Sequence, residues 1–301
     1  MEGERSKAER PGGGAEAMAL ARALESSRPD PDRLFEDRLA RGLLSPSTRL
    51  LFHLVRLPLV GTSLLGIGDA LAPGVRGFTI GRTRYIDDAL LAALGEGLDQ
   101  IVIFGAGYDG RAYRIPGIES TRVFEMDLPH IQAEKRKRLC HLLERTPDHV
   151  AFVPIDFESQ KLAEVLPSAG FREGRRTFFV CEGVTEHVSA GAADGIFRYA
   201  ASSATPESRI VFTYLDRGLL DGTKHFPGAR TYVSHSGFSL RSLALDPKQL
   251  RPYLSQRGLE LIEDLAGAEF AERYFEPSRR QLRANEFHRT ALARVLRPTA
   301  G

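Results

Sequence analysis

The stretch IVIFGAGYDGRAYR, residues 101–114, decides the fold, because an apolar run passes directly into a loop with three glycines. Such glycines either form a tight turn that serves only the fold, or let the backbone approach a bound ligand closely, as nucleotide-binding α/β proteins require. The GxGxxG spacing of Gly105–Gly110 fits the dinucleotide fingerprint. The spacing alone leaves both interpretations open.

Short β-branched or aromatic runs continue after this loop and alternate with segments of helical character. Continuous apolar strands that alternate with helices predict a parallel sheet covered on both faces. The fold class is therefore α/β, a doubly wound Rossmann-like sheet. The predicted strands are QIVIFGAG, TRVFEMDLP, HVAFVPIDF, RTFFVCEGV and SRIVFTYLD, followed by LELIEDLAGAEF and TALARVLRP, with the last expected at a sheet edge.

The part before the sheet has a helical pattern over residues 15–95, with apolar residues three and four positions apart. This pattern includes PDRLFEDRLARGLL and SPSTRLLFHLVRLPLV, where Pro46 and Pro58 fit a helix start and a helix stop. We expect three parts, a flexible tail over 1–14, a helical cap over 15–80 and a ligand-binding domain over 81–301. Residues 218–250 are less regular and are expected to form an insertion.

Length and composition are those of an ordinary globular protein. Of the 301 residues, 42% are hydrophobic and 27% charged, and the net charge of +2 gives no argument for nucleic-acid binding. The two cysteines, Cys140 and Cys181, stand in unrelated contexts and suggest neither a disulfide nor a metal site. The N-terminus has no apolar signal region, and the uncharged stretch Leu57–Gly68 is shorter than the ~20 residues that span a membrane. We therefore expect a cytoplasmic protein without a membrane partner.

Polar groups follow the first three strands where ligands bind in doubly wound sheets, at the carboxyl ends. The glycine loop ends the first strand, Glu125 and Asp127 end the second, and Asp156 and Phe157 end the third. A carboxylate about 20 residues past the glycines can accept hydrogen bonds from ribose hydroxyls. The next carboxylate can accept from an adenine amine while the ring packs on the purine. Each acid is also compatible with a solvated or helix-capping role, but three successive strand ends favour a ligand site.

The fourth strand opens into CEGVTEHV. Glu182 at its end is a candidate partner for a cationic ligand group, or a capping or ion-pairing residue. His187 is a candidate base, although a histidine at such a position is more often solvated. No metal ligand is expected here.

Two arginines precede the first strand in RTRYIDD. Arg82 or Arg84 can clamp a carboxylate with a bidentate fork, or simply pair with Asp87 and Asp88. The basic cluster Lys135–Arg138 has no interleaved aromatic residues and is expected to be a solvated helix face.

Five of these segments together resemble the leucine carboxyl methyltransferase family, and most of all its bacterial S-adenosylmethionine-dependent O-methyltransferases, some associated with polyketide biosynthesis. The resemblance runs from about residue 75 to 215, and more weakly to the C-terminus. It implies a class I methyltransferase fold, a seven-stranded sheet whose last strand is antiparallel. The segments are RTRYIDDAL, GAGYDGRAYR, VFEMDLP, PIDF and EGVTEHV, in the family's order and approximate spacing.

The resemblance also implies a site for S-adenosyl-L-methionine. Relatives usually have an aromatic residue and then leucine where this chain has His187 and Val188, so the methyl acceptor is not carried over. The implied roles are the cofactor carboxylate for Arg84 with Arg82 as its neighbour, the methionine part for Gly105, Ala106 and Gly107, the ribose for Asp127 with Glu125 as a competitor, the adenine for Asp156 and Phe157, and the ammonium or sulfonium for Glu182.

The sequence thus predicts an S-adenosylmethionine-dependent O-methyltransferase that methylates a carboxylate or hydroxyl of a small organic, polyketide-like substrate. A carboxylate acceptor needs no base, whereas a hydroxyl acceptor would use His187 or Glu182. The first alternative is an NAD(P)-dependent oxidoreductase, since a glycine loop and an acid fit both cofactors. The second is a non-catalytic interaction protein of the same fold. The apolar cap is expected either to close over the site or only to pack against the sheet.

Overall fold

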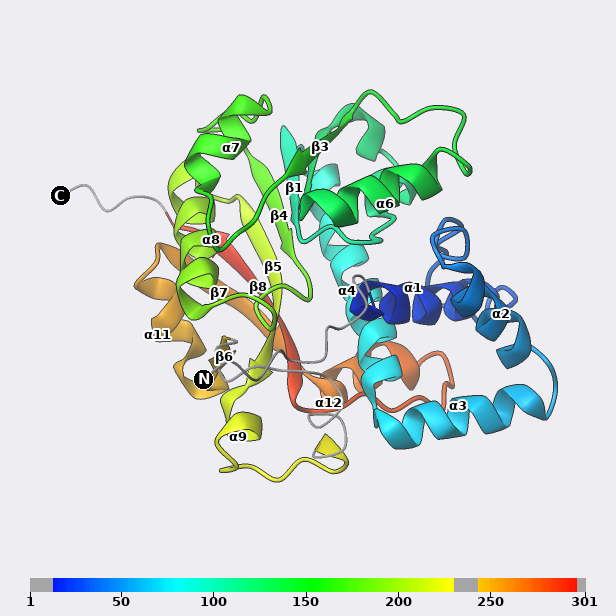
Figure 1. Cartoon of the computed structure of the whole chain (residues 1–301). Coiled ribbons are helices and arrows are strands. Elements are labelled where there is room, and N and C mark those ends of the chain that lie inside the picture. The colour runs from blue at the N-terminus through cyan, green and yellow to red at the C-terminus, as the bar shows by residue number, and fades with distance from the viewer. Residues whose placement is uncertain (1–12, 230–242, 297–301) are drawn as a thin grey trace, which may run out of the picture.

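The structure of the chain is a computed structural model that describes residues 13–229 and 243–296. A single sheet forms its centre, with helices on both faces (Figure 1). The strands follow the order β3-β2-β1-β4-β5-β8-β7, and the short β6 pairs with β5. Their bounds are β1 (Gln100–Phe104), β2 (Arg122–Asp127), β3 (Val150–Pro154), β4 (Thr177–Cys181), β5 (Arg209–Asp216), β6 (Ala244–Leu245), β7 (Leu259–Leu265) and β8 (His288–Val295).

The sheet confirms the predicted doubly wound α/β fold. Strands β1 to β5 are parallel, and β8 runs antiparallel to both β5 and β7. The expectation that the C-terminal strand lies at an edge is wrong. Because β8 is hydrogen-bonded on both sides, its Ala291 and Ala293 are fully buried, and β7 forms the edge instead.

The helices form two layers over the sheet. One hydrophobic cluster lies between the sheet and helices α7, α8 and α11. A second lies between the sheet and helices α4 and α12. The bounds are α1 (Gly13–Ser26), α2 (Pro46–Val55), α3 (Val60–Leu71), α4 (Val75–Gly95), α5 (Arg111–Arg114), α6 (Pro129–Leu139), α7 (Leu162–Ser168), α8 (Ala190–Ser203), α9 (Arg217–Leu220), α11 (Leu250–Ser255) and α12 (Gly267–Phe270), with short helical turns η1 (Ile118–Ser120), η2 (Pro247–Gln249) and η3 (Ala271–Phe275).

The predicted boundary between the cap and the ligand-binding domain falls inside a helix. The helix α4 runs without a break through the boundary expected at residues 80 and 81. Most of the expected tail, residues 1–12, and the middle of the expected insertion, residues 230–242, lie outside the described residues.

Residues 31–44, which were expected to be helical, form turns instead. Two buried carboxylates bind backbone amides in this segment: Glu25 Oε1 accepts from Leu34 N (2.8 Å), and Asp37 Oδ1 accepts from Leu39 N (3.2 Å) and Ala40 N (3.0 Å). Such side-chain bonds compete with the backbone bonds of a helix, and here they replace them.

The cap ends in two helices, α2 and α3, at the rim of the molecule away from the sheet (Figure 1). Ser45 caps α2, since its hydroxyl accepts from Thr48 N (3.4 Å), and Pro46 occupies the first turn as predicted. Within the described ranges no single helix has the length and apolar character to cross a membrane. Helices α2 and α3 reach this length and apolar character only when they are taken together, and a bend of 114° separates them.

Candidate functional site

The glycine loop follows β1 and is tightly packed. Gly105 and Gly107 have φ angles of +59° and +36°, in the left-handed region that favours glycine. A Cβ at Gly105 would lie 2.5 Å from Val184 Cγ2, and one at Gly107 would lie 3.3 Å from Ala15 Cβ in α1. Ala106 between them is buried. The fold itself therefore requires glycine at position 105, whatever else the loop does.

The two acids of β2 have different surroundings. Asp127 lies at the strand end, and its carboxylate accepts from Gly107 N (2.6 Å) and Leu128 N (2.7 Å). Burial raises the pKa of Asp127, although these amide donors oppose the rise. A carboxylate has about four acceptor positions, so these two bonds leave capacity for ribose hydroxyls.

Glu125, by contrast, is completely buried beneath the loop. Its Oε2 lies 2.8 Å from Lys135 Nζ and accepts from the Tyr113 hydroxyl (3.2 Å). Burial raises the pKa of Glu125, and the Lys135 ammonium opposes that rise. This position argues against the ribose contact that Glu125 was expected to share. It also corrects the expectation of a wholly solvated basic cluster, because Lys135 is a buried ion-pair partner.

Asp156 and Phe157 follow β3 and are half-buried. The Asp156 carboxylate accepts from Glu158 N (3.0 Å) and from the Ser159 hydroxyl (2.9 Å), which fixes the turn. The Phe157 ring packs edge-on against Phe104 of β1, with centroids 6.1 Å apart. Phe157 also lines a cleft of about 580 Å³ between α7 and α8, which none of the other predicted site residues lines.

The two arginines of α4 point to different places. Arg82 Nε lies 2.8 Å from Glu182 Oε1 at the end of β4. Arg84 instead pairs with Asp88 (2.8 Å) and donates to the Leu34 carbonyl (2.5 Å). Residues two apart on a helix point in nearly opposite directions, so only one of these arginines can face the strand ends. In this structure Arg82 is the one that reaches the strand ends, so the assignment of the cofactor carboxylate to Arg84 stays a prediction and Arg82 is its competitor.

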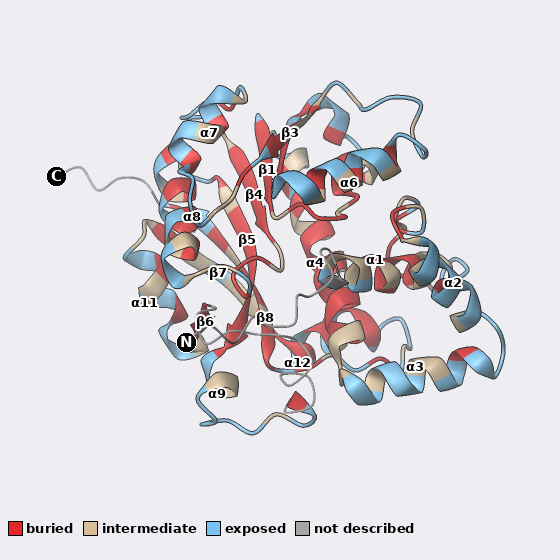
Figure 2. Cartoon of the chain, viewed as in Figure 1, coloured by how far each residue is buried: buried red, intermediate tan, exposed pale blue. Residues whose placement is uncertain are grey.

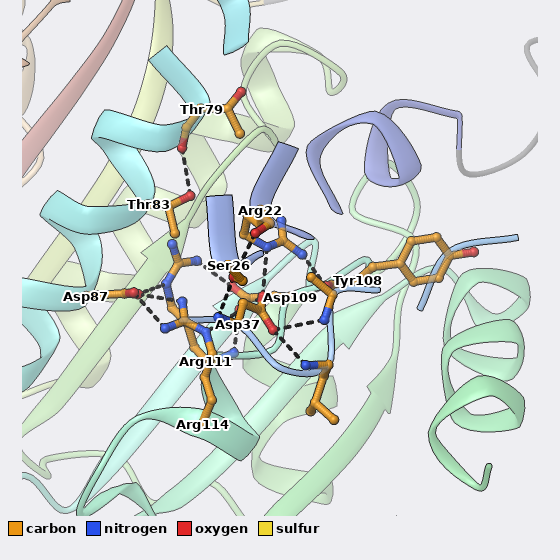
Figure 3. A network of polar contacts seen from close by, with 12 residues as sticks. Arg22, Ser26, Asp37, Thr79, Thr83, Asp87, Tyr108, Asp109, Arg111 and Arg114 are labelled. Atoms are coloured by element: carbon orange, nitrogen blue, oxygen red, sulfur yellow. Dashed lines mark hydrogen bonds and ion pairs between the residues drawn. The ribbon is translucent and has the colours of Figure 1, made fainter. Parts of the chain in front are cut away.

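Arg82 and Glu182 belong to a larger network of charges beside the glycine loop. Figure 3 shows the part of this network around Arg22, Asp37, Asp87, Asp109, Arg111 and Arg114. Its centre is Arg111, which is almost completely buried and contacts Asp87 (2.8 Å), Asp109 (2.6 Å) and Glu182 (2.5 Å). The network joins four arginines to four acids, Arg22, Arg82, Arg111 and Arg114 with Asp37, Asp87, Asp109 and Glu182.

Three donor atoms of this network lack an aligned acceptor among the described residues, Arg82 Nε, Arg111 Nη2 and Arg114 Nε. Arg82 Nε is close to Glu182, but the pair does not form a hydrogen bond of proper geometry. A buried donor without an acceptor is costly, and guanidinium groups are well suited to carboxylates. Of these donors, those of Arg82 and Arg111 belong to the two arginines that share Glu182, and they are the candidates for binding a carboxylate.

Glu182 stays ionised in this setting. Burial alone would raise its pKa, but the guanidinium groups of Arg111 and Arg82 outweigh burial and lower it. A carboxylate with a lowered pKa is a weak general base. The surroundings of Glu182 thus favour holding the two arginines in place over accepting a proton.

His187 is exposed in the turn after β4, and the sequence analysis missed a second histidine nearby. His288, at the start of β8, is buried and stacks on Phe78 with centroids 4.9 Å apart. The Arg82 guanidinium lies 5.2 Å from the centre of the same ring. His288 Nδ1 lies 3.1 Å from Asn285 Oδ1, which only accepts, so Nδ1 carries the proton.

Burial lowers the pKa of His288 well below the usual histidine value, and the nearby charges of Arg82 and His187 lower it further. The ring is therefore neutral at neutral pH, with Nε2 in the basic form. No sequence motif marks His288, because it follows an irregular segment. It comes close to Arg82 only in the folded chain. Over the described ranges, no group of three or more metal-ligating side chains is close enough to hold an ion.

Comparison with known proteins identifies the family to which this chain is similar. The profile of the family described as leucine carboxyl methyltransferase matches residues 15–201, more than half of the chain. The match begins in α1, whereas the motifs had suggested a start near residue 75. The matched residues therefore include the whole of the predicted cap, residues 15–80.

Several relatives have provisional names as S-adenosyl-L-methionine-dependent methyltransferases. One from Parafrankia sp. (strain EAN1pec) is 36% identical over 196 residues, which are 64% of this chain but only 60% of that protein. One from Mycolicibacterium gilvum (strain PYR-GCK) is 32% identical over 244 residues, 79% of this chain and 76% of that protein.

A solved structure supports the fold. The crystal structure of a protein from Thermobifida fusca YX, provisionally named a methyltransferase, superposes with a TM-score of 0.55 and covers 91% of this chain and 98% of its own. The identity of 14% limits this likeness to the fold. It agrees with the class I sheet whose last strand is antiparallel.

Proposed function

The chain belongs to the leucine carboxyl methyltransferase family of S-adenosylmethionine-dependent enzymes, and we propose that it methylates an oxygen of a small organic substrate. The observation that carries the cofactor part of the proposal is the pair of buried donors on the two arginines that share Glu182, Arg82 Nε and Arg111 Nη2, beside the glycine loop. The loop, the acids at two strand ends and these donors together suit a ligand with an adenosine part and an amino-acid part.

We propose the following division of the cofactor site. Arg82, oriented by Glu182, binds the carboxylate, and the loop Gly105–Gly107 lies along the methionine part. Asp127 accepts from the ribose hydroxyls, and Asp156 with Phe157 contacts the adenine. Support comes from the positions of these groups at the ends of β1 to β4.

The bound cofactor supplies an activated methyl group on a sulfonium. The residues of this chain then have to align the acceptor oxygen with that methyl group and exclude water. A carboxylate acceptor is already ionised and needs no base. For a hydroxyl acceptor, we propose that the exposed His187 takes the proton. Glu182 is held ionised between two arginines, and burial holds the pKa of His288 well below the usual histidine value, so both are weak bases.

The proposal is tested in two steps with the full chain. Calorimetric titration should show binding of S-adenosylhomocysteine and none of NAD, and the reverse result would overturn the cofactor assignment. Incubation with labelled S-adenosylmethionine and a panel of carboxylic acids, phenols and alcohols should give a base-labile ester or a stable ether. Binding without methylation of any acceptor would favour a non-catalytic protein.

A further inference from the structure

The helices α2 and α3 expose an apolar surface. In the described part of the chain, large hydrophobic side chains are exposed at thirteen positions, and eight of these lie within residues 50–71. We call these eight residues the α2–α3 surface. Figure 2 shows α3 in pale blue, the colour of exposed residues, over most of its length. The eight are Leu50, Leu51, Leu54, Leu57, Leu59, Val60, Ile67 and Leu71.

The exposed side chains follow helical periodicity. On α3, Val60, Ile67 and Leu71 recur at the spacing of one helix face and are 44%, 57% and 51% exposed. The only buried residue of α3 is Gly61. An apolar face of this kind normally packs against something, because isolated apolar residues are common on surfaces but contiguous apolar patches are not.

The charges of this surface are mostly positive. Helix α2 and its C-cap carry Arg49 and Arg56 and no acid, whereas α3 carries one acid, Asp69, which pairs with Arg76 (2.7 Å). Arg56 is exposed, with its guanidinium 5.5 Å from the centre of the Phe52 ring. The apolar face of α2 is therefore accompanied by cations along its own length.

A second group of cations adjoins the end of α3. A cavity of about 260 Å³, the arginine pocket, is lined by Arg28, Arg76, Arg279, Arg280, Gln281 and Leu282. Arg76 joins it to α3, since its guanidinium donates to Asp69 at 2.7 and 3.2 Å. Arg280 pairs with Glu25 (2.7 Å), whereas Arg28 and Arg279 have no acidic partner within the described ranges.

We propose that the α2–α3 surface and the arginine pocket dock the protein on a bilayer that contains anionic lipids. Apolar side chains enter the boundary between headgroups and acyl chains, and the arginines bind lipid phosphates. A second copy of the chain fits less well, because it would bring the same cations face to face. The helices lie in the interface and do not cross the bilayer.

The test uses the full-length protein and co-sedimentation with vesicles. Vesicles of phosphatidylcholine and phosphatidylglycerol in equal parts should retain the protein, and vesicles of phosphatidylcholine alone should retain much less. Ile67→Glu should weaken binding about tenfold or more, because it places a charge in the apolar layer. Arg56→Gln should weaken binding to the mixed vesicles about fivefold.

Ile262→Glu is the matched control, since Ile262 on β7 is 47% exposed and lies outside the α2–α3 surface. It should bind as the unmodified protein does, and circular dichroism should show that both variants are folded. Equal sedimentation of Ile67→Glu and Ile262→Glu, or none with either vesicle, would overturn the proposal. Self-association that Ile67→Glu abolishes, without vesicle binding, would assign the surface to a second copy. Because vesicle binding needs no methyl transfer, these results do not depend on the proposed enzymatic function.

Discussion

Arg82 and Glu182 approach to 2.8 Å at the carboxyl end of β4, yet the guanidinium nitrogen nearest the carboxylate has no well-aligned hydrogen bond. Arg111 shares the same carboxylate at 2.5 Å. Glu182 therefore brings two cations together while leaving donor atoms for a further anion. This relationship makes the predictions for the cofactor site specific.

Arg82→Gln should weaken binding of S-adenosylhomocysteine by about 1.5–3 kcal/mol, the value of a hydrogen bond to a charged group. The control is Arg84→Gln, only two residues away on the same helix but directed toward Asp88 and Leu34. It should leave affinity unchanged in calorimetric titration. The opposite order of effects would support the assignment that the sequence motif suggested.

Asp127→Ala and Asp156→Ala should each weaken cofactor binding by about 1–3 kcal/mol, as expected for a lost buried hydrogen bond. Asp221→Ala is a suitable control, because Asp221 is exposed and bonds only within its own turn. Unchanged affinity in both site variants, measured by titration, would remove the proposed ribose and adenine contacts.

Gly105→Ala should lower the free energy of unfolding for two reasons, a positive φ and a Cβ that meets Val184 at 2.5 Å. Gly117→Ala isolates the first reason, since Gly117 has a φ of +84° and open space around its Cβ. It should cost about 1 kcal/mol, and Gly105→Ala clearly more. Urea unfolding measures both, and the added change Val184→Ala should recover part of the difference.

Lys135→Met should cost about 3–5 kcal/mol of stability, because it leaves the Glu125 carboxylate buried without its cation. The double variant Glu125→Gln with Lys135→Met should be more stable than Lys135→Met alone. If the loss of stability in the double variant equals the sum of the losses in the two single variants, the ion pair is not coupled in the folded protein.

Stability should decline as the pH falls below about 6.5, where unfolded histidine binds a proton but buried His288 does not. The unfolded state then holds more protons, so protonation favours unfolding. His288→Gln should reduce this slope by up to about 1.4 kcal/mol per pH unit. Urea unfolding at a series of pH values measures the slope for both proteins.

The sheet was predictable because its strands are continuous apolar runs and each acid or glycine follows directly at a strand end. Parallel strands bring their carboxyl ends to the same edge of a sheet. The strand ends therefore predicted that four residues lie near one another, Gly105, Asp127, Asp156 and Glu182. The position of β8 was not predictable, since its short alternating pattern resembles that of an edge strand.

Side-chain direction was harder to predict than position. The motif does not show which face of α4 meets the sheet, so the sequence could not decide between Arg82 and Arg84. Lys135 is polar in sequence, but Glu125 compensates its charge inside the fold. His288 lies far from the glycine loop in the chain and comes near Arg82 only because β8 inserts next to β5.

The helix α4 carries Arg76 in its first turn and Arg82 six residues later, about 9 Å along one axis. Arg76 belongs to the arginine pocket and Arg82 to the proposed cofactor carboxylate. A lipid contact that displaces α4 at Arg76 would be linked to cofactor binding at Arg82, and such linkage would be reciprocal. An enzyme recruited to a lipid surface would then bind its methyl donor with a different affinity from the same enzyme in solution.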